Sequence, residues 1–306
     1  SELCPMLHSR IVDVLCEAGL PEGALTSVIH APEMAETVVD ALAAHPAVRR
    51  INFTGSSRVG RRVAEIGARY LKPCLLELSG KASLIVLEDA DIEAAALAAT
   101  YGAYFNQGQI CMTTERVVVV DEVADRFLAA MEAQCADLLA RRNGAKVGDL
   151  ISADAARRVG RLIDDALARG ATLVVGGEVS GAYVQPTLLD RVTPEMQIYS
   201  EESFGPIAAI VRVEDEAEAV SVANDTQYGL VASVFTADEA RGRAIARRLE
   251  TGVCHINGPT VYDDPSKPYG GVKTSGYGRF GGNWGIAEFT ELRWITVQDG
   301  PIHYPI

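Results

Sequence analysis

The sequence predicts an α/β protein. Short apolar runs that suit strands alternate with segments in which apolar residues recur every three or four positions, which is the spacing of one helical face. Glycine-rich turns separate the two kinds of segment. This alternation implies parallel strand pairing in a layered sheet. With 306 residues, 48% of them hydrophobic, the chain can bury a substantial core and has the length of roughly two domains.

The first part of the chain is predicted to hold two strands and two helices. Residues 9–18 form a helix with an apolar face, and residues 28–29 form a short strand. Residues 50–54 form a second strand, which Gly55 ends. A second helix follows, and its apolar face is made by Val59, Val63, Ile66 and Tyr70.

The pattern repeats with its own elements from Lys81 onward. The strands are predicted at residues 84–87, 116–120, 172–175, 207–213 and 230–235. The helices are predicted at residues 92–103, 123–139 and 155–167. Residues 291–297, near the end of the sequence, are expected to form one more strand.

Composition excludes several classes of function. The net charge of −13 argues against nucleic acid as a partner, because phosphate binding requires clustered Lys and Arg. The six cysteines contain no C-x-x-C pair and the five histidines no H-E-x-x-H, so we expect neither a disulfide framework nor a metal. No apolar run approaches the ~20 residues of a membrane span, and no basic-then-apolar leader is visible. We therefore expect a cytoplasmic protein without a membrane partner.

Cys111 and Glu77 are the candidate catalytic pair. Cys111 ends the stretch 105–111, Phe-Asn-Gln-Gly-Gln-Ile-Cys, and Glu77 opens the stretch 77–81, Glu-Leu-Ser-Gly-Lys. A catalytic cysteine needs a turn that exposes its sulfur, backbone N–H groups that hold an oxyanion and a separate base that activates water. The alternative is an inert buried cysteine and a surface carboxylate, because most free cysteines are core residues.

Gly55 and Gly60 are candidates for phosphate binding. They bracket a turn from a strand into a helix, where free N–H groups and the helix dipole favour an anion. The alternative is an ordinary helix capped by serine. The spacing G-x-x-x-x-G differs from G-x-G-x-x-G, so a dinucleotide would lie differently from that in a Rossmann complex.

Five motifs in order resemble those of the NAD(P)-dependent aldehyde dehydrogenase superfamily. They are residues 53–60, 77–81, 105–111, 201–206 and 268–276. The sequence around Cys111 and in the segments 277–282 and 289–294 is most similar to the salicylaldehyde and vanillin dehydrogenases.

The resemblance implies a domain organisation. Residues 1–79 correspond to the C-terminal part of a Rossmann-like NAD-binding domain, residues 80–288 to an α/β catalytic domain, and residues 289–306 to a C-terminal strand and tail used for oligomerisation. A homodimer or homotetramer is therefore expected. The N-terminal third of the family's chain, with an asparagine of the oxyanion hole, is expected upstream of residue 1. A loop near residues 149–150 is also expected to be absent.

The resemblance also implies which residues contact the cofactor. Ser56 and Val59 would contact the pyrophosphate, Glu202 the nicotinamide ribose and Phe204 the nicotinamide ring. Glu2 would bind the adenosine ribose diol and thereby favour NAD over NADP. The full set is Glu2, Gly55, Ser56, Val59, Gly60, Leu78, Glu202 and Phe204. Without the other motifs, the segment that contains Glu202 and Phe204 would be interpreted as a helix end or turn. Ser79 replaces the glycine that is usual in the family, and its side chain lies where the backbone normally approaches the nicotinamide.

The expected reaction is the oxidation of an aromatic aldehyde to its acid through a thiohemiacetal and a thioester on Cys111, with Glu77 as the base that activates water. The aldehyde pocket that the resemblance implies is apolar and contains ring hydroxyls, and generic core packing is the alternative for each member. Its residues are Phe105, Ile110, Met112, Tyr262 and Tyr269. Competing interpretations are an aliphatic or semialdehyde substrate, acyl transfer to coenzyme A, and a non-catalytic relative of the same fold.

Overall fold

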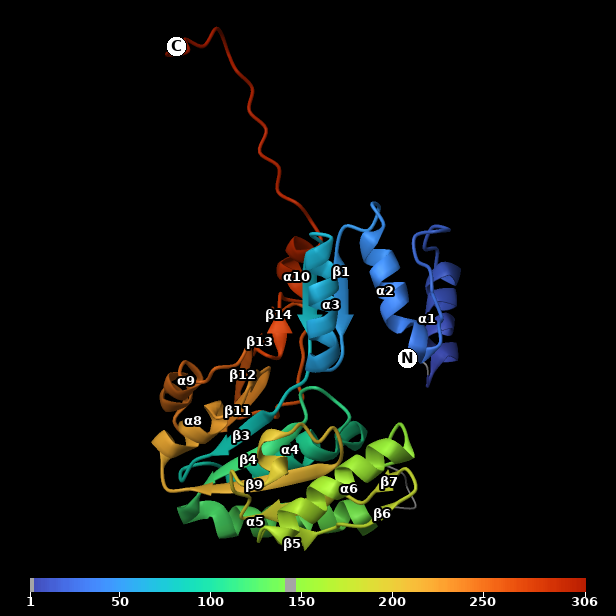
Figure 1. The fold of residues 1–306 in the computed structure, drawn as a ribbon. Coiled ribbons are helices and arrows are strands. Elements are labelled where there is room, and N and C mark those ends of the chain that lie inside the picture. Colours follow the sequence, from blue (N-terminus) through green and yellow to red (C-terminus); the bar gives the residue numbers. More distant parts are fainter. Residues whose placement is uncertain (1–2, 141–146) are drawn as a thin grey trace.

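The protein contains two main β-sheets, each covered by helices (Figure 1). The structure is a computed structural model, and it describes residues 3–140 and 147–306. The smaller sheet has the strand order β1-β2-β14 and the larger one the order β12-β11-β3-β4-β9-β8-β5. The predicted α/β fold class is confirmed.

The smaller sheet combines strands from an early and a late part of the sequence. It consists of β1 (Ile51–Thr54), β2 (Cys74–Glu77) and β14 (Gly276–Tyr277), of which β1 is parallel and β14 antiparallel to β2. The helices of this part are α1 (Pro5–Glu17), α2 (Ala35–Ala44), α3 (Ser57–Arg69) and α10 (Gly282–Glu288). Ser56 caps α3 by accepting a hydrogen bond from the Val59 amide, and Val63 of α3 packs on Leu76 and Leu78.

The larger sheet is parallel except at one edge. Its strands are β3 (Ala82–Val86), β4 (Thr114–Val120), β5 (Thr172–Val175), β8 (Thr187–Asp190), β9 (Ile207–Val213), β11 (Val231–Phe235) and β12 (Val253–Ile256). Only β5 pairs antiparallel, with β8. Every residue of β3 and β4 is buried, as expected for the centre of a parallel sheet covered on both faces.

Helices cover both faces of the larger sheet, and alternate residues of β3 show which helices lie on each side. Leu84 and Val86 pack with α4 (Ile92–Tyr104) and α5 (Asp121–Ala140), whereas Ile85 packs with α8 (Glu216–Asn224) and α9 (Glu239–Ala246). Helix α6 (Ala153–Ala168) covers β8 and β9. The short elements are η1 (Pro32–Met34), η2 (Phe105–Gly108), β6 (Val179–Ser180), β7 (Tyr183–Val184), α7 (Gln197–Ser200), β10 (Tyr228–Gly229) and β13 (Val272–Lys273).

The two sheets are joined by a short connection that carries the predicted base. Strand β2 ends at Glu77, and after residues 78–81 the chain enters β3 of the other sheet. The chain returns to the smaller sheet at β14, so this sheet also includes residues from beyond the predicted boundary at residue 79. Glu77 therefore lies where the two sheets meet.

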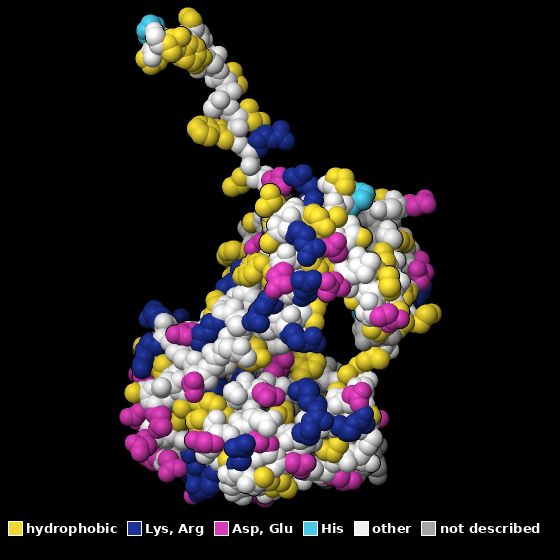
Figure 2. Space-filling model, in the orientation of Figure 1, with side chains coloured by type: hydrophobic (Ala, Val, Ile, Leu, Met, Phe, Trp, Pro, Cys, Tyr) yellow, Lys and Arg dark blue, Asp and Glu magenta, His cyan; other side chains and the backbone are white. Residues whose placement is uncertain are grey.

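Two predicted strands are wrong. Residues 28–29 and 291–297 have no regular secondary structure and belong to no sheet. A strand needs a neighbouring ladder to satisfy its backbone groups, and neither segment has one within the described chain. The second segment projects away from the body with apolar side chains along it (Figures 1 and 2), and Trp294 is 90% exposed. Its role in oligomerisation stays a prediction.

No helix within residues 3–140 or 147–306 combines the length and the apolar character that crossing a bilayer demands.

Candidate active site

A left-handed turn presents Cys111 shortly before β4, which begins at Thr114. Asn106, Gln107 and Gly108 have φ angles of 49°, 59° and 68°, a run that is sterically costly for the two side-chain-bearing residues. Only glycine fits at position 108, because a Cβ atom there would lie 2.2 Å from the carbonyl oxygen of Gly205. The turn therefore packs directly against the predicted cofactor segment 201–206.

Threonine hydroxyls fix this turn on both sides of the cysteine. The Thr113 hydroxyl donates to the Gly108 carbonyl at 3.0 Å, and the Thr113 amide donates to the Ile110 carbonyl at 3.0 Å. The Thr260 hydroxyl, from a distant loop, donates to the Met112 carbonyl at 2.7 Å. The backbone on both sides of Cys111 is thus held by a network of hydrogen bonds.

Glu77 approaches the same turn from the smaller sheet. Its side chain is at the end of β2 and the residue is only 4% exposed. Further along the connection, a Cβ atom on Gly80 would lie 2.4 Å from the Cys111 carbonyl oxygen. Only glycine allows the connection to pass this close to the cysteine turn.

One hydroxyl lies between the predicted nucleophile and the predicted base. The Tyr269 hydroxyl is 3.4 Å from the Cys111 sulfur and donates a hydrogen bond to Glu77 Oε1 at 3.4 Å. Burial raises the pKa of the Cys111 thiol to about 12, with a further contribution from the negative charge of Glu77, and burial also raises the pKa of Glu77. The charge of Glu77 therefore opposes the ionisation of Cys111, whereas hydrogen bonds from Cys111 and Tyr269 lower the pKa of Glu77.

Glu202 joins this cluster from the predicted cofactor segment 201–206. Glu202 Oε1 accepts a hydrogen bond from the Gly80 amide at 2.8 Å. Burial raises the pKa of Glu202, and this backbone bond and a hydrogen bond from the Ser79 side chain oppose the rise. Ser79, the residue that departs from the family's glycine, thus contacts the carboxylate predicted to hold a ribose.

A buried ion pair, which the sequence analysis did not assign, holds this region together. Lys81 Nζ lies 2.8 Å from Glu115 Oε2, and the two side chains are 0% and 3% exposed. Lys81 also donates to the Glu201 carbonyl at 2.6 Å. Burial lowers the pKa of Lys81, and the charge of Glu115 opposes this change. The only signal in the sequence was a charged residue at the start of each of two apolar strands.

Glu115 in turn receives the backbone of the predicted cofactor segment. It accepts hydrogen bonds from the Ser203 amide at 2.9 Å, the Ser203 hydroxyl at 2.9 Å and the Phe204 amide at 3.1 Å. Phe204 adopts a φ of 46°, and its ring is partly exposed. The ion pair therefore fixes both Glu202 and Phe204 relative to Cys111.

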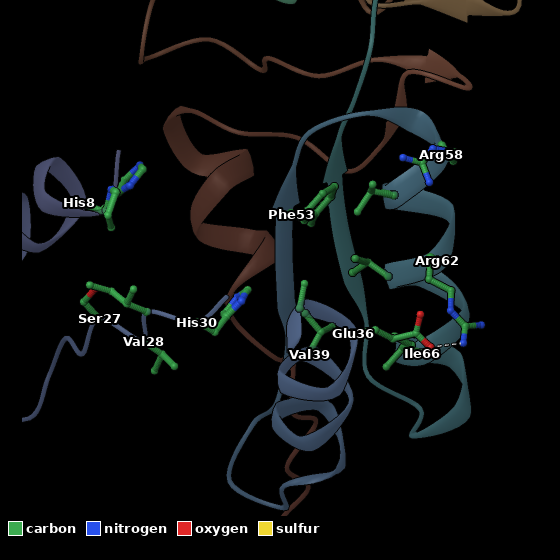
Figure 3. Close-up of a pocket in the computed structure, with 15 residues that line it drawn as sticks. His8, Ser27, Val28, His30, Glu36, Val39, Phe53, Arg58, Arg62 and Ile66 are labelled. Carbon is green, nitrogen blue, oxygen red and sulfur yellow. Dashed lines mark hydrogen bonds and ion pairs between the residues drawn. The ribbon is translucent and has the colours of Figure 1, made fainter. Parts of the chain in front are cut away.

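Two cavities lie on either side of the N-terminus of α3. The first, of about 530 Å³, lies between Phe53, Val39 and Ile66 on one side and His8 and His30 on the other (Figure 3). An ion pair between Arg62 and Glu36 lies at its edge (Figure 3). The second, of about 830 Å³, is lined by Ser56, Ser79 and Glu202, among others. Arg58 lines both cavities, so an extended ligand could cross from one to the other.

The predicted phosphate turn has a packing role as well. A Cβ atom on Gly60 would lie 2.3 Å from Leu78 Cδ2, so Gly60 and Leu78 let α3 approach the sheet closely. Ser56 does cap the helix, as the alternative interpretation expected. Val59 lines the first cavity, Ser56 lines the second, and Gly55 directly precedes the cap. Glu2 lies outside the described residues.

The predicted aldehyde pocket is only partly assembled. Met112 and Tyr269 pack with Cys111 around Leu230 and Val231, and Ile110 adjoins Cys111 in the turn. Phe105 instead stacks on Tyr101 with ring centroids 5.0 Å apart and lines a separate cavity. Tyr262 packs edge-on to His255 at 5.5 Å and lines yet another cavity.

No group of three His, Cys, Asp or Glu side chains suited to a metal ion occurs in the described part of the chain.

Comparison with known proteins agrees with this geometry. The sequence profile described as "Aldehyde dehydrogenase family" matches residues 1–295. A vanillin dehydrogenase of Pseudomonas fluorescens is 53% identical over 309 residues, which cover 100% of this chain and 64% of the relative. A salicylaldehyde dehydrogenase of Pseudomonas putida is 44% identical with the same coverage. The chain thus spans 64% of the length of these curated relatives.

A solved structure with the same fold is the crystal structure of a salicylaldehyde dehydrogenase from Pseudomonas putida G7 complexed with salicylaldehyde. It has a TM-score of 0.93 and 44% sequence identity, over 98% of this chain and 63% of that chain.

Loss of the buried cation is predicted to destabilise the whole protein. Lys81→Met leaves the Glu115 carboxylate buried without its partner, so urea unfolding should show a loss of about 3–5 kcal/mol. The double variant Lys81→Met/Glu115→Leu should recover part of this loss, because it buries no unpaired charge. Glu239→Gln, in the exposed pair with Arg243, is the matched control and should cost less than about 1 kcal/mol. Wild-type stability of Lys81→Met would contradict the assigned role of the pair.

Proposed function

Because this chain belongs to the aldehyde dehydrogenase family, we propose that it oxidises an aromatic aldehyde to the carboxylic acid with NAD as the electron acceptor. The observation that carries the proposal is the meeting of three groups where the two sheets join. Cys111 and Glu77 share the Tyr269 hydroxyl at 3.4 Å, and Glu202 lies on the neighbouring Gly80 amide. A nucleophile, a base and a ribose-binding carboxylate are the parts that this reaction requires.

The residues around the two cavities suit a dinucleotide. The N-terminus of α3 and the guanidinium of Arg58 offer positive potential for a pyrophosphate, and the two oxygens of Glu202 can accept bonds from ribose hydroxyls. The partly exposed ring of Phe204 offers a surface for a nicotinamide ring. When bound there, NAD would supply the acceptor for the hydride that leaves the aldehyde carbon.

Cys111 would carry the substrate through the reaction. Its thiolate attacks the aldehyde carbon, so that a carbon–sulfur bond forms and the carbonyl electron pair moves onto oxygen. The backbone N–H of Cys111 has no hydrogen-bond partner among the described residues, so it is free to hold this oxyanion. Once the carbon has lost its hydride, the product on Cys111 is a thioester.

Glu77 would complete the cycle as the general base. It takes a proton from water, the resulting hydroxide attacks the thioester carbon, and the thiolate leaves with its electron pair. Burial raises the pKa of Glu77 toward the operating pH, which makes it a better base than an exposed carboxylate. A base for water disfavours acyl transfer to coenzyme A, because such a reaction must preserve the thioester.

The aromatic substrate is supported by the relatives and by the surroundings of the sulfur. The two curated relatives named above act, by their names, on vanillin and salicylaldehyde. Met112 and Tyr269 provide apolar and ring surface beside Cys111. A planar aldehyde with a ring hydroxyl suits such a wall.

A panel of aldehydes is the test of class and substrate. Initial rates of NADH absorbance should be highest with salicylaldehyde, vanillin or benzaldehyde, lower with aliphatic aldehydes and succinic semialdehyde, and lower with NADP than with NAD. Cys111→Ala should abolish the rate. A preference for the semialdehyde would replace the aromatic assignment. No NADH with any aldehyde would leave a non-catalytic relative as the function.

Glu77→Gln is predicted to stop the reaction at the thioester. Since the amide cannot take a proton from water, acyl-enzyme should accumulate on Cys111 after one turnover, and steady turnover should fall about 10²–10⁴-fold. Mass spectrometry of the Cys111 peptide measures this adduct. Glu178→Gln, at an exposed carboxylate, is the matched control. Steady turnover of Glu77→Gln at the wild-type rate would remove Glu77 from this role.

A further inference from the structure

We propose that Tyr269 is a further catalytic residue, whose hydroxyl is a single hydrogen-bond donor shared in turn by the Cys111 thiolate and the Glu77 carboxylate. From the sequence, Tyr269 was expected only to line the aldehyde pocket. The part concerning Cys111 needs no assumption about substrate, whereas the part concerning Glu77 rests on the proposed function.

The backbone fixes the position of this hydroxyl. The Tyr269 amide donates to the Phe280 carbonyl at 3.0 Å, and the Phe280 amide donates back to the Tyr269 carbonyl at 2.7 Å. The ring packs with Leu230 and Val231, so its direction is set by the core as well. Its oxygen is held at the same distance, 3.4 Å, from the sulfur and from Glu77 Oε1.

A phenol has one proton to donate and two acceptor positions, so it can serve only one anion at a time. With the thiol protonated, the hydroxyl donates to Glu77. When Cys111 ionises, rotation about the C–O bond brings the same proton to the sulfur. The hydroxyl therefore stabilises the thiolate before the attack and the carboxylate before hydrolysis.

The groups around Cys111 and Tyr269 explain why a neutral donor stabilises the two anions. Among the described residues, Glu77 and Glu202 are the charged groups that raise the pKa of Cys111, and Cys111, Glu77 and Asp263 raise the pKa of Tyr269. All four partners become negative when they ionise. Burial, with these charges, raises the pKa of Tyr269 far above its ordinary value, so the phenol keeps its proton. Its hydrogen bond lowers the pKa of Cys111 and of Glu77.

Tyr269→Phe tests the proposal, because it removes only the oxygen and keeps the ring. The readout is the rate at which iodoacetamide alkylates Cys111 across a pH series, followed by mass spectrometry of the Cys111 peptide. Loss of a hydrogen bond to an anion should move the midpoint of this profile upward by about one pH unit and slow alkylation at neutral pH about tenfold. Tyr277→Phe, at a half-exposed ring on β14, should leave the profile unchanged.

A folding control and a second genetic background complete the alkylation experiment. Cys135, which is fully buried, reports folding in the same digest, since it should resist alkylation in every folded variant. In a Glu77→Gln background, Tyr269→Phe should still raise the Cys111 midpoint if the hydroxyl acts on the sulfur directly. An effect that disappears in that background, or a Tyr269→Phe profile that equals the wild-type profile, overturns the shared donor.

The outcome is separable from that of the proposed function. Alkylation uses neither aldehyde nor cofactor, so a protein that oxidises no aldehyde can still show the Tyr269 effect. Conversely, an active dehydrogenase whose Cys111 profile ignores Tyr269 retains the proposed function and loses this inference.

Discussion

The buried ion pair between Lys81 and Glu115 is the constraint on which the site depends. Lys81 lies in the connection that follows Glu77, and Glu115 lies at the beginning of β4, the strand that follows Cys111. Removing two charges from water is costly, and the cost is offset here by the Glu201 carbonyl on the cation and by the Ser203 and Phe204 amides on the anion. Because these groups come from three separate segments, the pair sets base, nucleophile and cofactor loop in one geometry.

The chemistry of the site depends on close backbone packing and on the negative groups around Cys111. Gly80 and Gly108 allow backbones to approach within distances at which any Cβ atom would collide, and this brings Glu77, Cys111 and Glu202 into one acidic cluster. In this cluster burial raises the pKa of Cys111, Glu77 and Glu202, and the charges of the two carboxylates raise the pKa of Cys111 further. A neutral donor such as the Tyr269 hydroxyl relieves this repulsion without adding a charge.

Much of the fold was predictable because its elements carry local signals. The periodic helix around Val63 and the strand with the valine run 117–120 are confirmed near their predicted bounds. The strands predicted at residues 28–29 and 291–297 failed because a strand also needs a neighbour, which no local pattern encodes. The motif residues Cys111 and Glu77 do meet, yet Phe105 and Tyr262 face other cavities. The Lys81–Glu115 pair and the Tyr269 bridge link distant segments, so they became visible only in three dimensions.

Hydrogen–deuterium exchange of the native protein tests the central constraint most directly. The amides of Ser203 and Phe204 lie in a loop without regular structure, where exchange is ordinarily fast, but both donate to the buried carboxylate of Glu115. If the ion pair holds this loop, these two amides exchange as slowly as those of the central strand β4. Exchange of both at the rate of an open loop would show that the ion pair does not hold the cofactor segment, and would contradict the account.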